Sequence, residues 1–314
     1  ELARPPLFSC VLLDADTEGV LLFSFNHLIV DAWALAILQR ELVLTWHALG
    51  RGDVPAFEPL DLSASEHATA MHEELAPIFK RGREAYPPWP PDAYRLPLDH
   101  PAPVAPRREG TIVTRRVDAA FLTRIRAATA DAGVPLTAAL VAAFQYALHR
   151  HARRPDVAFT VVRSGRSSRA LREVVAYLSY GDTVEGRLVP GETWAALLER
   201  AGRIVLDESS ERVPYNLIVQ PPSMRVVLNV HNFTSNAAET APFHYEHENR
   251  HPYLWPVWDL FFQILPVDGA LLVEVLYRDQ VLRSETVAQL WGSFERALTA
   301  LTETPSAEIS AEVD

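Results

Sequence analysis

Helical and strand-like hydrophobic patterns alternate along most of this chain, and that alternation restricts its fold more than any other feature. Segments with apolar residues at helical spacing are separated by short runs rich in β-branched and aromatic residues. The helical segments are 118–132, 136–151, 193–206 and 286–301, and clear strand-like segments are 110–117 and 156–162. The alternation predicts an α/β fold, a sandwich of mixed β-sheets covered by helices.

A proline-rich stretch, 86–106, interrupts this pattern. Proline has no backbone N–H and its ring clashes with the preceding helical turn, so a helix cannot run through such a stretch. We therefore expect a structural boundary close to residue 95.

Near the N-terminus, two apolar runs, 9–13 and 20–25, flank a segment of turn-forming residues, 14–19. Two short strand patterns joined by turn chemistry predict a β-hairpin. Cys10 lies in the first of these runs, so we expect it to be a small buried residue.

A helix is predicted directly after the hairpin. Leucines recur at helical spacing from Leu35 to Leu49, Asp31 is suited to the N-cap, and Gly50 is suited to a left-handed C-terminal cap. His27 therefore leaves the end of a strand just before a helix begins.

His27 and Asp31 follow the pattern HxxxD at this junction. An imidazole can take a proton from an attacking amine or hydroxyl near neutral pH if a neighbour fixes its orientation. Asp31 is better suited to that orienting role than to acting as the base. A histidine at a strand end more often packs or bonds to backbone, so the rest of the sequence has to decide.

The stretch from Asn26 to Ala32, NHLIVDA, resembles the HHxxxDG signature of nonribosomal peptide synthetase condensation domains. The second histidine of the signature is His27 and its aspartate is Asp31. The first histidine is replaced by Asn26 and the glycine by Ala32.

The resemblance continues to the C-terminus in the order of the family. The matching segments are 96–103, similar to LPTDRPRP; 164–166, similar to AGR; 174–180, in the place of VGFFVNT; 213–215, similar to VPFE; and 227–232, similar to FVLQN. Arg166 is the arginine of the segment similar to AGR. Tyr180 stands where VGFFVNT has asparagine, and Asn232 is the last residue of the segment similar to FVLQN.

The resemblance implies a chloramphenicol-acetyltransferase-like fold of two lobes, each with mixed β-sheets covered by helices. Residues 1–95 would be the remainder of the N-terminal lobe, carrying the altered signature, and 96–314 would be the C-terminal lobe. Because the family has about a hundred further residues before the signature, the N-terminal lobe would be incomplete.

The resemblance also implies a function, the joining of two acyl groups held as phosphopantetheine thioesters on donor and acceptor carrier proteins, usually as an amide. The partners would be these carrier proteins and neighbouring synthetase domains, with no cofactor or metal bound intrinsically. His27 would deprotonate or position the acceptor amine, and Asp31 would pair with Arg166 or with an arginine in the missing N-terminal portion.

The remaining motif residues have expected roles of a structural kind. Trp33 would pack the start of the helix, Asn26 would hydrogen-bond to its neighbours, and Ala32 would take the place of the glycine. Tyr180 and Asn232 are possible cleft residues.

A second interpretation stays open, in which the chain is a condensation-like domain without catalysis that docks a carrier protein or recruits a tailoring enzyme. The changes around Tyr180 favour this interpretation, and the retained His27 favours catalysis.

Composition excludes other classes of function. The net charge is −11, and the arginines are dispersed, with Lys80 the single lysine, so we expect no nucleic-acid partner. No apolar run approaches the roughly 20 residues that span a bilayer, and a single cysteine suits a reducing cytoplasm. The sequence lacks the P-loop, dinucleotide-binding and GxSxG signatures.

His244, His247 and His251 are spaced like metal ligands. They lie between prolines without a helical pattern, and zinc needs preorganised ligands, so we interpret this segment as a solvated loop.

Overall fold

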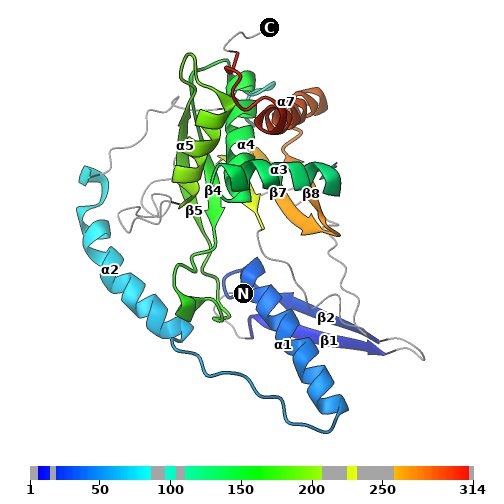
Figure 1. The fold of residues 1–314 in the computed structure, drawn as a ribbon. Coiled ribbons are helices and arrows are strands. Elements are labelled where there is room, and N and C mark those ends of the chain that lie inside the picture. The colour runs from blue at the N-terminus through cyan, green and yellow to red at the C-terminus, as the bar shows by residue number, and fades with distance from the viewer. Residues whose placement is uncertain are drawn as a thin grey trace. The chain divides into compact units, whose positions relative to one another are not determined.

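The structure is a computed structural model, and it describes residues 6–14, 19–85, 96–103, 110–206, 225–231 and 258–310 (Figure 1). Contacts divide the chain into two compact units, which we describe separately. The first takes in the described residues of 1–76 together with Ser164–Tyr180, and the second takes in those of 77–163, 181–232 and 248–314. Each unit combines separate stretches of the chain, so the units do not test a single boundary in the sequence. The division into lobes at residue 95 stays a prediction.

The second unit is built on a six-stranded mixed sheet with the order β3-β8-β7-β6-β4-β5. Strands β3, β8 and β7 pair antiparallel, whereas β6 pairs parallel with both β7 and β4. The strands are β3 (Thr111–Val117), β4 (Asp156–Arg163), β5 (Tyr180–Arg187), β6 (Val226–Val230), β7 (Leu260–Val267) and β8 (Ala270–Tyr277).

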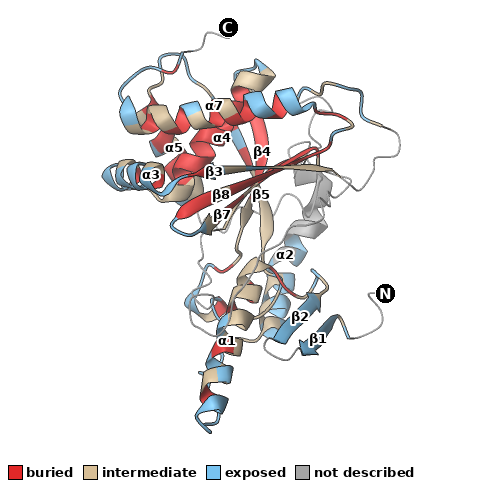
Figure 2. Cartoon of the chain, turned by 90° about the vertical axis from the view of Figure 1, so that its right-hand side faces the viewer, coloured by how far each residue is buried: buried red, intermediate tan, exposed pale blue. Residues whose placement is uncertain are grey.

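Helices cover one face of this sheet (Figure 1). They are α3 (Ala119–Asp131), α4 (Leu136–Ala152), α5 (Trp194–Leu206) and α7 (Ser284–Glu303). Helix α4 lies at the centre, where it contacts α3, α5, α7 and the strands β4 and β6. Every residue from Ala138 to His149 is buried, and Figure 2 shows α4 almost entirely in the buried colour. A helix that is apolar around its whole circumference is one that is enclosed on all sides.

The opposite face of the sheet carries a smaller apolar cluster. Phe261 belongs to it, whereas its neighbours Leu260 and Phe262 belong to the main core. Successive side chains of a strand point to opposite faces, so β7 contributes to both. The predicted α/β class, a mixed sheet covered by helices, is therefore confirmed.

Among the described residues, no single helix is both long and apolar enough to span a bilayer. Helices α3 and α4 meet the length and composition requirement only as a pair, and the chain bends by 103° between them.

In the first unit, β1 (Phe8–Asp14) and β2 (Gly19–Phe25) form an antiparallel hairpin whose register runs from Phe8↔Phe25 to Asp14↔Gly19. The predicted hairpin is confirmed. The prediction that Cys10 is buried is wrong, because every residue of β1 is exposed in this two-stranded sheet and Cys10 is exposed with them.

Helix α1 (Ala32–Gly50) follows, with Asp31 as its N-cap, as predicted. The predicted left-handed cap at Gly50 is wrong. Gly50 is the last helical residue, and the left-handed residue is Gly52, with φ 77°. Hydrogen bonds from Gly52 N to Leu49 O and from Asp53 N to Ala48 O complete a Schellman motif, which needs its glycine beyond the cap.

Helix α2 (Ala64–Ala85) contains Pro77, and most of the proline-rich stretch beyond it lies outside the described residues.

Candidate functional site

A turn between β2 and α1 presents His27. The backbone N–H of Asn26 donates to Leu7 O (2.8 Å), which continues the hairpin ladder, and the N–H of Ile29 donates to Asn26 O (3.1 Å). The side-chain oxygen of Asn26 accepts from the N–H of Leu28 (3.0 Å). This local bond closes an Asx-type turn. Asn26 thus shapes the backbone on which His27 stands.

The imidazole of His27 has a defined orientation. Its Nδ1 lies 2.7 Å from Val30 O, and its side chain is exposed. A carbonyl oxygen can only accept a hydrogen bond, so in the neutral ring the proton is on Nδ1. The lone pair is therefore on Nε2, which is the arrangement of a general base.

The ring of Tyr177 contacts the ring of His27 edge to face, with centroids 5.1 Å apart and an interplanar angle of 79°. Partial burial raises the pKa of Tyr177 above its usual value of 10.0, and the negative charge of Asp31 adds to this shift. The phenol therefore stays protonated at neutral pH.

Asp31 is 2% exposed, and both of its carboxylate oxygens are hydrogen-bonded. Oδ1 caps α1 by accepting from Ala34 N (2.8 Å). Oδ2 accepts from Arg166 Nη1 (2.8 Å), Leu178 N (3.0 Å), Ser179 N (3.1 Å) and Ser179 Oγ (2.9 Å).

Burial by itself raises the pKa of Asp31. The hydrogen bonds from Arg166, Ala34 and Leu178, with the positive charge of Arg166, outweigh that effect and hold the pKa below its usual value of 3.8. Asp31 is therefore ionised at neutral pH and, enclosed by donors, is not placed to exchange protons with a substrate.

The side chain of Arg166 is fully buried, with an exposed fraction of 0%. Besides Asp31, it binds the carbonyl oxygens of Ser164 (3.1 Å, from Nη1), Val174 (3.2 Å, from Nη2) and Ala176 (3.0 Å, from Nη2). A buried charge is tolerated when its partners replace water in this way. The pair therefore joins the start of α1 to the segment 174–179.

Trp33 covers this ion pair. The centroid of its ring lies 5.7 Å from Cζ of Arg166, and its Nε1 donates to Arg172 O (2.9 Å). Both contacts fix the start of α1 against the segment that carries Arg166.

Gly165 allows the segment 164–166 to approach the segment 174–179 closely. Its φ is 66°, and a Cβ at this position would lie 2.0 Å from Leu178 O. Glycine adopts the left-handed backbone without strain and has no Cβ, so it is the one residue that meets both requirements.

Ala32, in the place of the signature glycine, is the first residue of α1 and does not have a positive φ. An alanine costs no backbone strain in that conformation.

The structure brings His27, Asp31, Trp33 and Arg166 together within the first unit. Of the arginine partners left open by the sequence, Arg166 is the one in contact with Asp31. Tyr180 is half-buried at the first position of β5.

Asn232 lies outside the described residues, as do His244, His247 and His251.

Sequence reasoning missed Tyr177 and Ser179. The segment 174–180 is singled out by its resemblance, but that resemblance points to Tyr180 and not to Tyr177, the first tyrosine of the segment.

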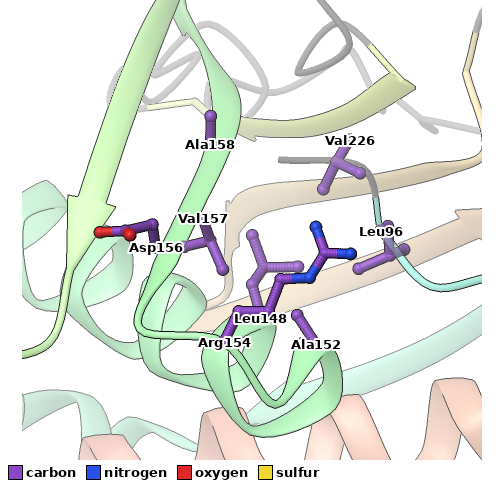
Figure 3. Close-up of a pocket in the computed structure, with 8 residues that line it drawn as sticks. All are labelled: Leu96, Leu148, Ala152, Arg154, Asp156, Val157, Ala158 and Val226. Carbon is purple, nitrogen blue, oxygen red and sulfur yellow. The ribbon is translucent and has the colours of Figure 1, made fainter. Parts of the chain in front are cut away.

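A separate small cavity lies in the second unit, lined by Leu96, Leu148, Ala152, Arg154, Asp156, Val157, Ala158 and Val226. In Figure 3 the side chain of Arg154 extends between Leu96 and Val226, while that of Asp156 points away. The volume is about 10 Å³, which is room for one water molecule and not for a substrate.

Comparison with known proteins gives a match over nearly the whole chain. A family model described as "Condensation domain" matches residues 1–313. Among curated proteins, a linear gramicidin synthase of Brevibacillus parabrevis is 22% identical over 333 aligned positions, which cover 99% of this chain and 4% of that protein. The chain thus spans a small part of that relative's length.

Solved structures share the fold. The epimerization domain from the third module of tyrocidine synthetase B has a TM-score of 0.75 and 14% identity, covering 96% of this chain and 73% of that one. The X-domain from teicoplanin biosynthesis has a TM-score of 0.73 and 20% identity, covering 98% and 75%. These likenesses confirm the fold class that the resemblance implied.

Proposed function

This chain belongs to the condensation-domain family, and we propose that it acts as a condensation domain of a nonribosomal peptide synthetase, with His27 as its catalytic residue. The family supports an acyltransferase type of reaction in general. The observation that supports this role here is the contact between Nδ1 of His27 and Val30 O, which places the lone pair of the neutral ring on Nε2 of an exposed side chain.

In the proposed reaction, the amine of an acceptor aminoacyl group attacks the carbonyl carbon of a donor thioester. A C–N bond forms, and the amine nitrogen becomes positively charged while the carbonyl oxygen becomes negative. Nε2 of His27 takes the proton from that nitrogen. When the tetrahedral intermediate collapses, the C–S bond breaks, and the imidazolium returns the proton to the departing thiolate. The products are an amide and a free thiol, and His27 is regenerated.

Asp31 and Arg166 do not react in this proposal. They bind each other and nearby backbone groups, so they hold the loop that carries His27. Trp33, packed on the guanidinium of Arg166, supports the same loop.

The proposed partners are donor and acceptor carrier proteins and the neighbouring synthetase domains. Both acyl groups would arrive as thioesters on phosphopantetheine arms. Tethering of two substrates replaces a bimolecular encounter with an effectively intramolecular one, which supplies much of the rate.

The alternative, a condensation-like domain that only docks a carrier protein or recruits a tailoring enzyme, gains no support from the geometry of the site. A histidine held by its Nδ1 proton with an exposed side chain is arranged for proton transfer.

The experiment that tests the proposal is a condensation assay with loaded donor and acceptor carriers on the protein and its His27→Ala variant. Because the side chain of His27 is exposed, the variant is expected to fold normally, while its rate falls at least about tenfold. Leu28→Ala, which changes the adjacent exposed residue, is the matched control and keeps its rate. An unchanged rate in His27→Ala would remove the catalytic role.

A further inference from the structure

Tyr177 is held from both sides by the buried ion pair. On one side, Ala176 O accepts a hydrogen bond from Arg166 Nη2 (3.0 Å), and on the other, Leu178 N donates to Asp31 Oδ2 (3.0 Å). The backbone that carries Tyr177 is thus fixed by two charged groups that are themselves buried.

His27 needs more than its hydrogen bond to be oriented. The contact of Nδ1 with Val30 O restrains one ring atom of an exposed side chain. The edge-to-face contact with Tyr177 adds a second point, and together the two contacts define the plane of the ring and the direction of Nε2. Edge-to-face packing is one of the favoured geometries of aromatic pairs.

We propose that Tyr177 is a positioning residue, whose ring holds the imidazole of His27 in the orientation for proton transfer. The Asp31–Arg166 pair then acts on His27 through Tyr177 as well as through the start of α1. This inference rests on the proposed catalytic role of His27.

The ring, and not the hydroxyl, carries this role. The observed contact joins the two rings, and a phenylalanine would keep it. Tyr177 is also 46% exposed, so truncation of its side chain leaves no closed cavity in a core, and a variant is expected to stay folded.

The test compares Tyr177→Phe with Tyr177→Leu in the full chain. The first variant keeps the ring and the second removes it. Three quantities are measured: the condensation rate with loaded carriers, the midpoint of thermal unfolding, and the ¹⁵N NMR signals of the His27 ring. The chain has 11 histidines, and the signals that disappear in His27→Ala identify those of His27.

We expect Tyr177→Phe to match the parent in all three measurements. Tyr177→Leu should unfold at nearly the same temperature but lose roughly two- to tenfold in rate, the range that corresponds to the free energy of an aromatic pair. Its His27 signals should move from the Nδ1–H form toward the Nε2–H form, because a freed ring exchanges between tautomers.

The inference is overturned if Tyr177→Phe loses as much rate as Tyr177→Leu, since the hydroxyl would then be the active group. It is also overturned if Tyr177→Leu keeps the parent's His27 signals, whatever its rate. The NMR measurement needs no turnover, so it decides the positioning role even if His27→Ala shows that the proposed function is wrong.

Discussion

Asp31 and Arg166 are separated by 135 positions in the sequence, yet Oδ2 of one lies 2.8 Å from Nη1 of the other, in an ion pair whose side chains are 2% and 0% exposed. The pair connects the N-cap of α1 with the segments 164–166 and 174–179. His27 stands on the loop that this pair anchors, so several consequences can be measured.

Removal of one charge from the pair is expected to lower the stability of the fold strongly. Arg166→Met leaves the buried carboxylate of Asp31 without its cation, which typically costs about 3–5 kcal/mol in the free energy of unfolding. Urea unfolding of the variant and the parent measures this difference. Arg124→Met, which breaks the exposed ion pair with Glu303, is the control and is expected to change little. Similar losses in the two variants would show that the buried Asp31–Arg166 pair contributes no more to stability than an exposed ion pair.

Gly165 is expected to tolerate no side chain. Gly165→Ala adds strain at φ 66° and brings a Cβ to 2.0 Å from Leu178 O, so Leu178 has to move away from Asp31. Gly52→Ala is the matched control, because Gly52 has φ 77° with nothing within 4 Å of an added Cβ. The control should cost about 1–2 kcal/mol for the backbone alone, and Gly165→Ala clearly more. Equal midpoints of thermal unfolding would contradict the close approach.

Trp33 is expected to act on stability and not on the reaction. Trp33→Phe keeps an aromatic face over Arg166 but loses the hydrogen bond from Nε1 to Arg172 O. The expected loss is about 1 kcal/mol in the free energy of unfolding, the net value of an ordinary hydrogen bond, with the condensation rate preserved. A large loss of rate in a fully folded variant would contradict a role of Trp33 in stability alone.

The second unit is expected to become less stable in mild acid because of His149. Burial, and then the charge of Arg200, lower the pKa of His149 below its usual value of 6.5, although its Nδ1 donates to Arg154 O (2.8 Å). The unfolded chain therefore binds a proton at higher pH than the folded protein. The stabilising contribution is complete above pH 6.5 and declines as the pH falls below it, by at most about 1.4 kcal/mol per pH unit.

Urea unfolding between pH 7.5 and pH 5.5 measures this slope. His149→Asn keeps a donor at the position of Nδ1 and cannot titrate, so its stability should vary less with pH over that interval. An equal slope in the parent and the variant would assign the acid sensitivity to other groups.

Much of the local structure follows from the sequence alone. The hairpin, the helix after it and the N-cap at Asp31 were predictable, because hydrophobic period and turn chemistry are properties of neighbouring residues. The predictions that were wrong depend on the three-dimensional surroundings of a residue. Cys10 is exposed although its strand pattern is apolar, and the left-handed residue after α1 is Gly52 instead of Gly50, since the hydrogen bonds of the Schellman motif decide which residue turns.

In the candidate site, too, some residues were predictable from the sequence and others were not. The HxxxD pattern identified His27 and Asp31, and the resemblance identified Arg166. Tyr177 and Ser179 were missed, because a tyrosine and a serine between apolar residues have no local signal that distinguishes a site from a surface.

The sequence by itself determined which segments become helices and strands, the membership of the family, and the presence of a histidine and an aspartate at a strand-to-helix junction. Tertiary structure alone decided that a tyrosine in a distant segment meets that histidine, and it decided between the arginines that the sequence left open as partners of that aspartate. The physical reason is that periodicity and capping act between near neighbours, whereas the partners of a buried charge are whatever groups folding brings within hydrogen-bonding distance, and no local pattern records their identity.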